Sequence, residues 1–294
     1  MLSGKFGHSR YLTWLRRYDG KLEMPTVQEP TFLGCPGGGS GNLNVYRRGR
    51  VGGFVVFEKI YDSHSEHLSR TLWFHQTVLP KLEGVIKTPR ILDVAQGEKL
   101  TAVYFEYVEG TAVKPVDLIP RVLHFCASTT DLSDAMAGHR FDFGFQDNSL
   151  YRDGVGMLIQ LLRSAGRSAS LISNLESYLL RPAVQKKFAH ADLSPSNVWE
   201  DGTILDFDQC GFYPDGYDLS RALATAQVQG FSTPDELESL VTQRMPSASL
   251  DSIVAHFYFT SVFRARSIKR TGWSAKSVLT LFDRAIELTQ GSKD

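Results

Sequence analysis

Four side chains that can bind a metal ion or accept a proton lie close together in this sequence: Asp192, Asn197, Asp206 and Asp208. Asp192 and Asn197 flank Pro195, which favours one tight loop. Asp206 and Asp208 lie two residues apart on a β-prone run, so we expect their side chains on the same face. Such oxygen ligands suit Mg²⁺, which prefers few protein ligands together with substrate phosphates, and a remaining carboxylate can accept a proton from an attacking hydroxyl group.

The segments that must position this cluster begin as short β-prone runs interrupted by glycine, which predict antiparallel hairpins. Between residues 63 and 80 the hydrophobic period becomes helical, and Pro80 is expected to end that helix. Two more β-prone runs follow. We predict a small antiparallel sheet with one helix, from the segments 31–33, 43–48, 54–61, 63–80, 90–94 and 101–108.

Beyond Glu109-Gly110 helical patterns predominate, apart from a β-prone island at 187–198 and 203–207 that carries the polar cluster. A short amphipathic helix is also expected within residues 1–24, packed on the main body, with a role at a membrane surface or in partner docking as the alternative. The patterns predict an α+β fold class. Its expected parts are an N-terminal extension, a first lobe and a mainly helical second lobe, over residues 1–30, 31–110 and 111–294.

The polar cluster follows a recognisable signature. Its pattern is H-x-D-x-x-x-x-N from His190 to Asn197, followed by a hydrophobic residue, Asp206 and Phe207. This resembles the catalytic signature of the protein-kinase-like fold. The wording Asp-Leu-Ser-Pro-Ser-Asn, from Asp192 onwards, is most similar to the aminoglycoside phosphotransferase and choline kinase family of small-molecule kinases.

The similarity to this family covers residues 31–220 in order. It includes Lys59 on a strand after the glycine-rich hairpin, the segment Phe105–Gly110, which resembles the family's hinge between lobes, and the segment Gly216–Leu219. The resemblance implies a bilobal fold with a sheet-containing N-lobe and a helical C-lobe. It also implies Mg²⁺-dependent transfer of a phosphoryl group from ATP or GTP to a hydroxyl group of a small molecule.

For the catalytic loop, the resemblance implies that Asp192 is the catalytic base, braced by His190 and Asp218. Asn197 and Asp206 are then expected to bind Mg²⁺. The remaining metal candidate, Asp208, is expected to support a second metal ion or the acceptor.

For the nucleotide, the resemblance implies that Lys59 holds the α- and β-phosphates. Backbone N–H groups of the glycine loop would cover the phosphates, and the hinge would receive the purine ring. These further nucleotide contacts are expected at Gly37, Gly38, Gly39, Ser40, Gly41, Glu106, Tyr107 and Val108. The loop has no Walker A lysine and no G-x-G-x-x-G spacing, so it is neither a P-loop nor a Rossmann loop.

Two departures from the family pattern bear on activity. The ion pair with Lys59 needs a glutamate in the middle of the following helix, but Glu66 comes at its start and is only a possible partner. A kinase-like module that binds nucleotide or another ligand without turnover is therefore the alternative interpretation. Ser194 stands where protein kinases typically have lysine, and no A-P-E segment follows Asp218, which disfavours protein substrates.

Composition limits the remaining possibilities. The 32 basic and 32 acidic residues cancel, which disfavours a general nucleic-acid binder. The only cysteines, Cys35, Cys126 and Cys210, are far apart, which favours a reducing compartment over a disulfide scaffold. Without a secretory h-region or an apolar run long enough to span a membrane, we expect a soluble cytoplasmic protein with no evident obligate protein partner.

The acceptor has the weakest signal in the sequence. Residues 210–294 carry nine basic and nine acidic residues, so no acidic excess indicates a site for a cationic acceptor. Arg266, Lys269 and Arg270 instead share one face of a predicted helix. They are possible acceptor contacts, and they favour a neutral or anionic, carbohydrate-like acceptor. A solvated basic helix face remains the alternative.

Overall fold

The structure is a computed structural model that describes residues 8–33, 42–135, 149–180, 186–214, 216–225, 239, 257–266 and 274–291. The chain divides into two compact units. The first comprises Met1–Thr111 and Asp201–Gln209, and the second comprises Ala112–Glu200 and Cys210–Asp294. Residues 201–209 belong to the predicted second lobe along the sequence, but in the structure they group with the first unit. The division into an extension and two lobes stays a prediction.

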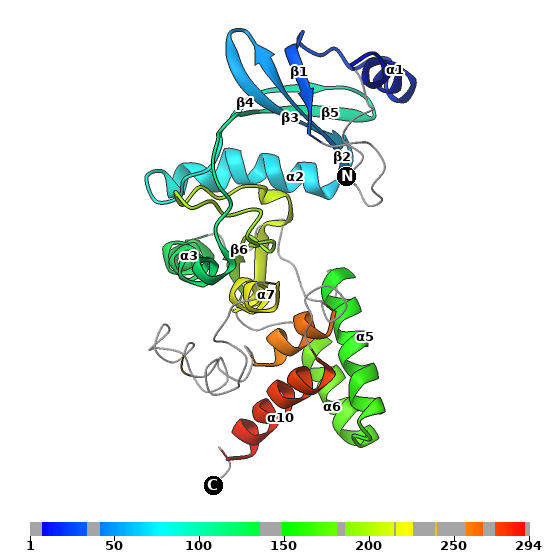
Figure 1. The fold of residues 1–294 in the computed structure, drawn as a ribbon, viewed down its shortest axis with the longest axis vertical. Coiled ribbons are helices and arrows are strands. Elements are labelled where there is room, and N and C mark those ends of the chain that lie inside the picture. Colours follow the sequence, from blue (N-terminus) through cyan, green and yellow to red (C-terminus); the bar gives the residue numbers. More distant parts are fainter. Residues whose placement is uncertain are drawn as a thin grey trace. The chain divides into compact units, whose positions relative to one another are not determined.

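A five-stranded antiparallel sheet forms the centre of the first unit, in the spatial order β1-β2-β3-β5-β4 (Figure 1). The β2–β3 hairpin turns at Gly52 and Gly53, whose φ angles are 54° and 88°. Tight hairpin turns need such positive φ values, which glycine adopts without steric cost. The strands are β1 (Gln28–Phe32), β2 (Asn42–Val51), β3 (Phe54–Asp62), β4 (Ile91–Gln96) and β5 (Leu100–Glu106).

Each face of this sheet is covered by one helix, α1 (His8–Tyr18) or α2 (Glu66–Trp73). Val56 of β3 packs in one hydrophobic cluster with Tyr11 of α1. Tyr61 of the same strand packs in another with Leu68 of α2. Because successive side chains of a strand point to opposite faces, Lys59 lies on the face that α2 covers.

The N-terminal helix α1 is bonded to the sheet as well as packed on it. Glu58 of β3 forms a buried ion pair with Arg47 of β2 at 2.7 Å and also accepts a hydrogen bond from the Tyr11 hydroxyl group. Just after α1, the Asp19 carboxylate accepts a hydrogen bond from the backbone N–H of Leu100 at 2.9 Å. The amphipathic helix predicted within residues 1–24 thus packs on the main body.

Helix α2 continues beyond its regular part. Ser65 caps its start, because the Ser65 hydroxyl oxygen accepts a hydrogen bond from the Leu68 N–H at 3.3 Å. A π-helical turn, Phe74–Val78, and a 3₁₀ turn, Leu79–Leu82, follow without a break. Pro80 was expected to end the helix, but it lies in the first turn of the 3₁₀ segment, where its missing N–H removes no helical hydrogen bond.

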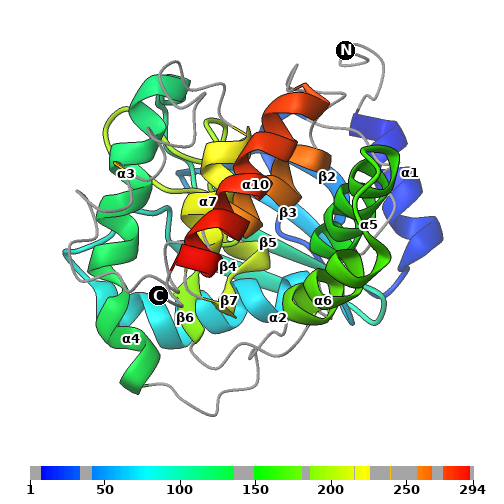
Figure 2. The same cartoon turned by 90° about the horizontal axis from the view of Figure 1, so that it is seen from below.

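The second unit is mainly helical. Its helices are α3 (Pro115–Ser128), α4 (Thr130–Ala135), α5 (Ser149–Ser164), α6 (Ala169–Leu180), α7 (Tyr217–Thr225), α10 (Ala275–Gly291) and an unlabelled helix at 257–266. Helices α5 and α6 lie side by side (Figure 2). Gly154 of α5 permits close approach to the helix at 257–266, because a Cβ atom there would lie 2.8 Å from a methyl carbon of Val262.

The β-prone island is shorter than predicted. Lys186–Ala189 forms β6, which pairs with β7 (Gly211–Pro214) in a two-stranded antiparallel sheet. The strand predicted over 203–207 is wrong: Thr203 makes only an isolated parallel bridge with Lys87, and Phe207–Gln209 is a 3₁₀ turn. Within the described parts of the chain, no helix is long and apolar enough to cross a membrane.

Candidate active site

Lys59 is the centre of a charge cluster in the first unit. Its Nζ donates hydrogen bonds to Oδ1 of Asp206 at 2.5 Å and to Oδ2 of Asp208 at 2.9 Å. The side chains of Lys59 and Asp208 are each 3% exposed, whereas that of Asp206 is 34% exposed. Two carboxylates around one ammonium group leave an excess of negative charge, and Asp206 is the carboxylate that is accessible to solvent.

Burial and charge oppose each other in this cluster. Burial disfavours the charged form of Lys59, but Tyr61, Asp206 and Asp208 outweigh it and raise the pKa of Lys59 well above its usual value. Burial raises the pKa of Asp208, and the Lys59 ammonium group opposes that increase. Lys59 therefore stays positively charged at neutral pH and holds both carboxylates.

The loop that carries the two aspartates is held against α2. The carbonyl oxygen of Asp208 lies 3.1 Å from Nδ1 of His67, and that of Gln209 accepts a hydrogen bond from Arg70 at 3.1 Å. Phe207 stacks on Phe74, with ring centroids 3.6 Å apart and an angle of 6° between the ring planes. The side of α2 and its following turn that faces this loop is therefore basic and aromatic.

The two aspartates meet for a different reason from the one predicted. A continuous strand would have placed them on one face, but Asp206 has a left-handed φ of 65° and Asp208 lies in the following 3₁₀ turn. A positive φ is costly for a residue other than glycine, so the surrounding contacts must maintain it. The ammonium group of Lys59 is the contact that the two carboxylates share.

Glu66 is not the partner of Lys59. It is the first residue of α2, its side chain is 61% exposed, and its carboxylate pairs with Arg70 one helical turn later at 3.2 Å. The structure thus gives Lys59 two aspartates as partners in place of the suggested glutamate. The reason is positional, because Glu66 lies on the exposed side of the first turn of α2, whereas Leu68 in the same turn is buried.

In the second unit, Asp192 follows β6 on a loop and is held through both carboxylate oxygens. Oδ1 accepts a hydrogen bond from Arg221, whose other terminal nitrogen donates to the backbone carbonyl of Ala191. Oδ2 lies 3.3 Å from Nδ2 of Asn197, which also donates to the backbone carbonyl of Asp192 at 2.9 Å. The carboxylate therefore has a defined orientation while its side chain stays 25% exposed.

The backbone of the same loop is bonded to α7. The Asp218 carboxylate accepts hydrogen bonds from the N–H groups of His190 and Ala191, both at 2.8 Å. Nδ1 of His190 accepts a hydrogen bond from the N–H of Asp192 at 3.1 Å. Burial raises the pKa of Asp218, while His190 and the two backbone bonds act against the increase. Ala191, at a left-handed φ of 64°, is fixed by these contacts.

Arg221 is a site residue that was not predicted from the sequence. It lies on α7, three residues after Asp218, so both side chains share one face of the helix. Burial disfavours its charge, but Asp192 and Tyr217 outweigh burial and raise the pKa of Arg221. The spacing from Asp218 is the signal that could have indicated this residue.

The structure describes only some of the other predicted nucleotide and acceptor contacts. Gly37, Gly38, Gly39, Ser40, Gly41, Lys269 and Arg270 lie outside the described residues. The backbone N–H groups of Glu106 and Tyr107 bond within the first unit, to Arg90 and Val55, and Val108 is half-buried. Arg48 lies over the Tyr107 ring at 4.3 Å. Of the possible acceptor contacts, Arg266 is half-buried at the end of its helix.

The residues predicted to bind Mg²⁺ divide between the two units. Asp206 and Asp208 belong to the first unit and Asn197 to the second. Within the described residues, no group of three or more His, Cys, Asp or Glu side chains could hold a metal ion. The donor set still fits Mg²⁺, because the negative excess around Lys59 consists of carboxylate oxygens and Mg²⁺ takes few protein ligands.

The comparisons with known proteins agree with this architecture. A solved aminoglycoside phosphotransferase from Streptomyces rimosus, in complex with ADP and streptomycin, is 17% identical, with a TM-score of 0.52 over 87% of this chain and 98% of that chain. A choline kinase from Streptococcus pneumoniae is 15% identical over 90% of this chain and 95% of its own, with a TM-score of 0.47. The likeness to the first of these structures confirms the predicted protein-kinase-like fold.

A family model assigns the chain more directly. The phosphotransferase enzyme family matches residues 36–238, more than half of the sequence, and this chain belongs to that family. The predicted enzyme class, a phosphotransferase of the small-molecule kinase type, is thereby confirmed. No curated protein sequence matches the chain.

Proposed function

We propose that this protein is a Mg²⁺-dependent kinase that transfers the terminal phosphoryl group of ATP, or of GTP, to a hydroxyl group of a small molecule. The observation that carries the proposal is the bonding of Lys59 to both Asp206 and Asp208. It brings a fixed positive charge, suited to phosphates, together with the carboxylates suited to Mg²⁺. The ADP bound by the Streptomyces rimosus relative supports a nucleotide donor.

Each group then has a defined task. Lys59 binds the α- and β-phosphates, and Asp206 and Asp208, with Asn197, would hold Mg²⁺, which supplies neutralisation of phosphate charge when bound. Asp192 accepts a hydrogen bond from the acceptor hydroxyl group and takes its proton during attack. Arg221 orients that carboxylate through a hydrogen bond. Positioning and electrostatics provide most of the rate enhancement in reactions of this kind.

We propose a neutral or anionic, carbohydrate-like acceptor. The support is the charge balance of residues 210–294, with nine basic and nine acidic residues. Arg266, with Lys269 and Arg270, remains the candidate acceptor contact. We also propose a reducing, cytoplasmic location, in keeping with a sequence that has only three cysteines, far apart along the chain.

The test compares three aspartates. We expect Asp192→Ala to lower turnover by about 10²- to 10⁴-fold, the usual contribution of a general base, while nucleotide affinity stays near the wild-type value. Asp206→Ala should lower the Mg²⁺-dependent affinity for nucleotide as well as turnover. Asp153→Ala, an exposed carboxylate on α5, is the matched control and should change neither. Half the wild-type turnover in Asp192→Ala contradicts the proposal.

One observation favours a second candidate function, a kinase-like module that binds nucleotide without turnover. Glu66 pairs with Arg70 and leaves Lys59 without the glutamate typical of kinases. Two measurements distinguish the kinase from the binding module. Thermal-shift titrations with Mg-ATP and Mg-GTP measure nucleotide binding. An assay of ADP or GDP release over a panel of sugars, sugar acids and aminoglycosides then measures turnover. Binding without release across the panel favours the module. Efficient turnover of aminoglycosides alone contradicts the proposed acceptor class.

A further inference from the structure

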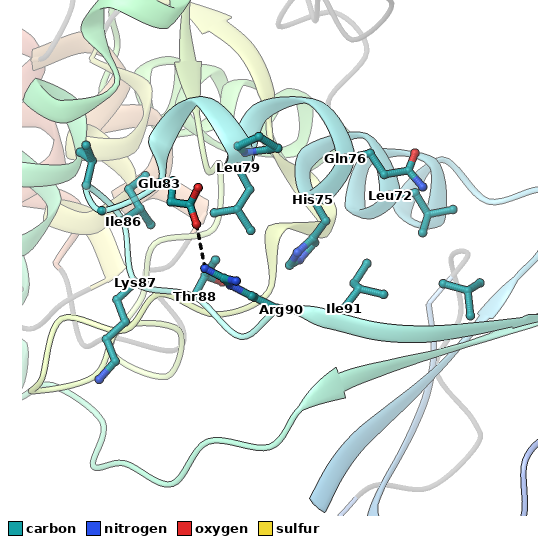
Figure 3. A pocket seen from close by; sticks show the side chains of 14 residues that line it. Leu72, His75, Gln76, Leu79, Glu83, Ile86, Lys87, Thr88, Arg90 and Ile91 are labelled. Carbon is teal, nitrogen blue, oxygen red and sulfur yellow. Dashed lines mark hydrogen bonds and ion pairs between the residues drawn. The ribbon is translucent and has the colours of Figure 1, made fainter. Parts of the chain in front are cut away.

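A pocket of about 720 Å³ lies in the first unit, between the helical segment that follows Glu66 and strand β4 (Figure 3). Its lining comes from α2 and its two following turns, from the loop after Leu82, and from the start of β4. No residue with a predicted role in nucleotide, metal or acceptor binding lines it. The volume lies within the range of small-molecule sites in proteins.

The walls of this pocket are largely aliphatic. Leu72 and Leu79 line it from the helical side and Ile91 from the strand. Val85 and Val94 also line it, and they are 49% and 36% exposed, which is high for apolar side chains of this size. A ligand in the pocket would therefore remove apolar surface from water, which is favourable.

The charged groups of the lining are already paired. Glu83 and Arg90 form an ion pair at 3.0 Å beside the pocket (Figure 3). The ammonium group of Lys87 pairs with Asp201. Because these charges compensate one another, the pocket has no charge preference that would select an ionic ligand.

His75 gives the pocket a specific polar contact. Its side chain extends from the helix into the space between helix and strand (Figure 3). Its ring packs edge-on against Phe74, with centroids 5.2 Å apart, and lies 5.5 Å from the ring of Phe105. Its Nδ1 atom is buried and has no hydrogen-bond partner in the described part of the chain. Burial lowers the pKa of His75 to about 4, so the imidazole is neutral at physiological pH.

We propose that this pocket binds a neutral, ring-shaped small molecule that supplies the missing hydrogen bond of His75, and that α2 transmits its binding to the loop carrying Asp206 and Asp208. A buried polar atom without a partner costs free energy that a bonded ligand restores. The importance of this coupling for catalysis rests on the proposed function.

The coupling follows from the two sides of one helical segment. Leu72 and Leu79 lie on the side that lines the pocket. His67, Arg70 and Phe74 contact residues 207–209 instead. A ligand that fixes the helical segment against β4 also fixes the contacts that hold the aspartate loop.

The binding test uses three bicyclic probes of the same size: indole, a hydrogen-bond donor; benzofuran, an acceptor; and indene, which is neither. Each is titrated into the full chain labelled at histidine Cε1 with ¹³C, and the His75 signal is assigned by its loss in His75→Phe. We expect indole or benzofuran, according to the imidazole tautomer, to shift this signal with a dissociation constant of about 1 mM, the range for such small ligands. Indene should bind at least about five-fold more weakly to the wild type.

Matched variants on β4 make the test specific. Val94→Trp fills the pocket and should abolish the shift, whereas Leu92→Trp, at a residue that is 47% exposed and does not line the pocket, should leave it unchanged. In His75→Phe, thermal shift of the protein should give equal dissociation constants for the three probes. No shift with any probe, or wild-type binding in Val94→Trp, overturns the proposed site.

Coupling is measured by amide hydrogen exchange of the peptide that contains residues 206–210, which needs no nucleotide. We expect slower exchange at saturating probe, and unchanged exchange overturns the coupling. The affinity for Mg-ATP is measured in parallel. A chain that fails to bind nucleotide refutes the proposed function, while the probe titration and the exchange experiment still decide this inference.

Discussion

Replacing Arg221 by methionine tests how Asp192 is held. The methionine keeps much of the apolar volume but removes the hydrogen bond to the Asp192 carboxylate and the one to the Ala191 carbonyl. A hydrogen bond to a charged group contributes about 1.5–3 kcal/mol. If that energy orients the carboxylate in the transition state, turnover falls by about 10- to 100-fold at about 1.4 kcal/mol per factor of ten.

The stability effect is expected to be of similar size. Arg221 is buried, and the Asp192 side chain is 25% exposed, so the freed carboxylate can be partly hydrated. We therefore expect Arg221→Met to lower the free energy of unfolding by about 2–3 kcal/mol, below the 3–5 kcal/mol typical for a fully buried charge left alone. Arg221→Lys keeps the charge but cannot make both hydrogen bonds, so its losses should be smaller.

The assays are ADP release at saturating Mg-ATP, the nucleotide dissociation constant, and urea unfolding. Arg284→Met, which removes an exposed ion pair with Glu287 on α10, is the control and should change none of these. Nucleotide affinity should also stay unchanged in Arg221→Met, because Arg221 acts on the Asp192 loop.

A double-mutant cycle decides whether Arg221 acts through Asp192. In an Asp192→Ala background, Arg221→Met should cost no further turnover, because the carboxylate that it orients is gone. Wild-type turnover in the single variant, or additive losses in the double variant, would contradict this role of Arg221.

Three further predictions concern the first unit. Lys59→Met should raise the KM for nucleotide, and an unchanged KM in steady-state assays means that another residue binds the phosphates. Tyr11→Phe removes a hydrogen bond to the buried Glu58 carboxylate. It should lower the free energy of unfolding, measured in urea, by about 1.5–3 kcal/mol without changing the KM for nucleotide. A loss below about 0.5 kcal/mol, the range of ordinary surface substitutions, contradicts this prediction. Hydrogen bonds from Lys87 and the Thr203 N–H lower the pKa of Asp201 to about 2. The charged Asp201 carboxylate should therefore stabilise the fold above about pH 4. This stabilisation should be lost as the pH falls through about 2, because the unfolded chain binds more protons in that range. The free energy of unfolding of Asp201→Asn, measured as a function of pH, should be lower than that of the wild type by less than about 1 kcal/mol at pH 7, since the ion pair with Lys87 is exposed. Below pH 2 the two free energies should be equal. A difference that persists at low pH contradicts the role assigned to Asp201.

The class of this protein can be recognised from its catalytic signature alone. A signature such as His190 to Asn197, followed by Asp206, depends on residues that are close along the chain, so its spacing is visible without any tertiary information. The sheet and the α2 helix inserted between its strands were also predictable, because the hydrophobic period changes from two to 3.6 between strand and helix. The glycine pair at 52–53 marks its hairpin.

The partners of the charged residues, in contrast, depend on how the chain folds. Lys59 and Asp206 are 147 positions apart, and Arg221 and Asp192 are 29 apart, so no local pattern links either pair. Glu66, the suggested partner of Lys59, pairs instead with Arg70, because its side chain lies on the exposed side of α2. The left-handed backbone of Asp206 depends likewise on contacts from α2 and Lys59, and contacts formed across such distances arise only when the chain has folded.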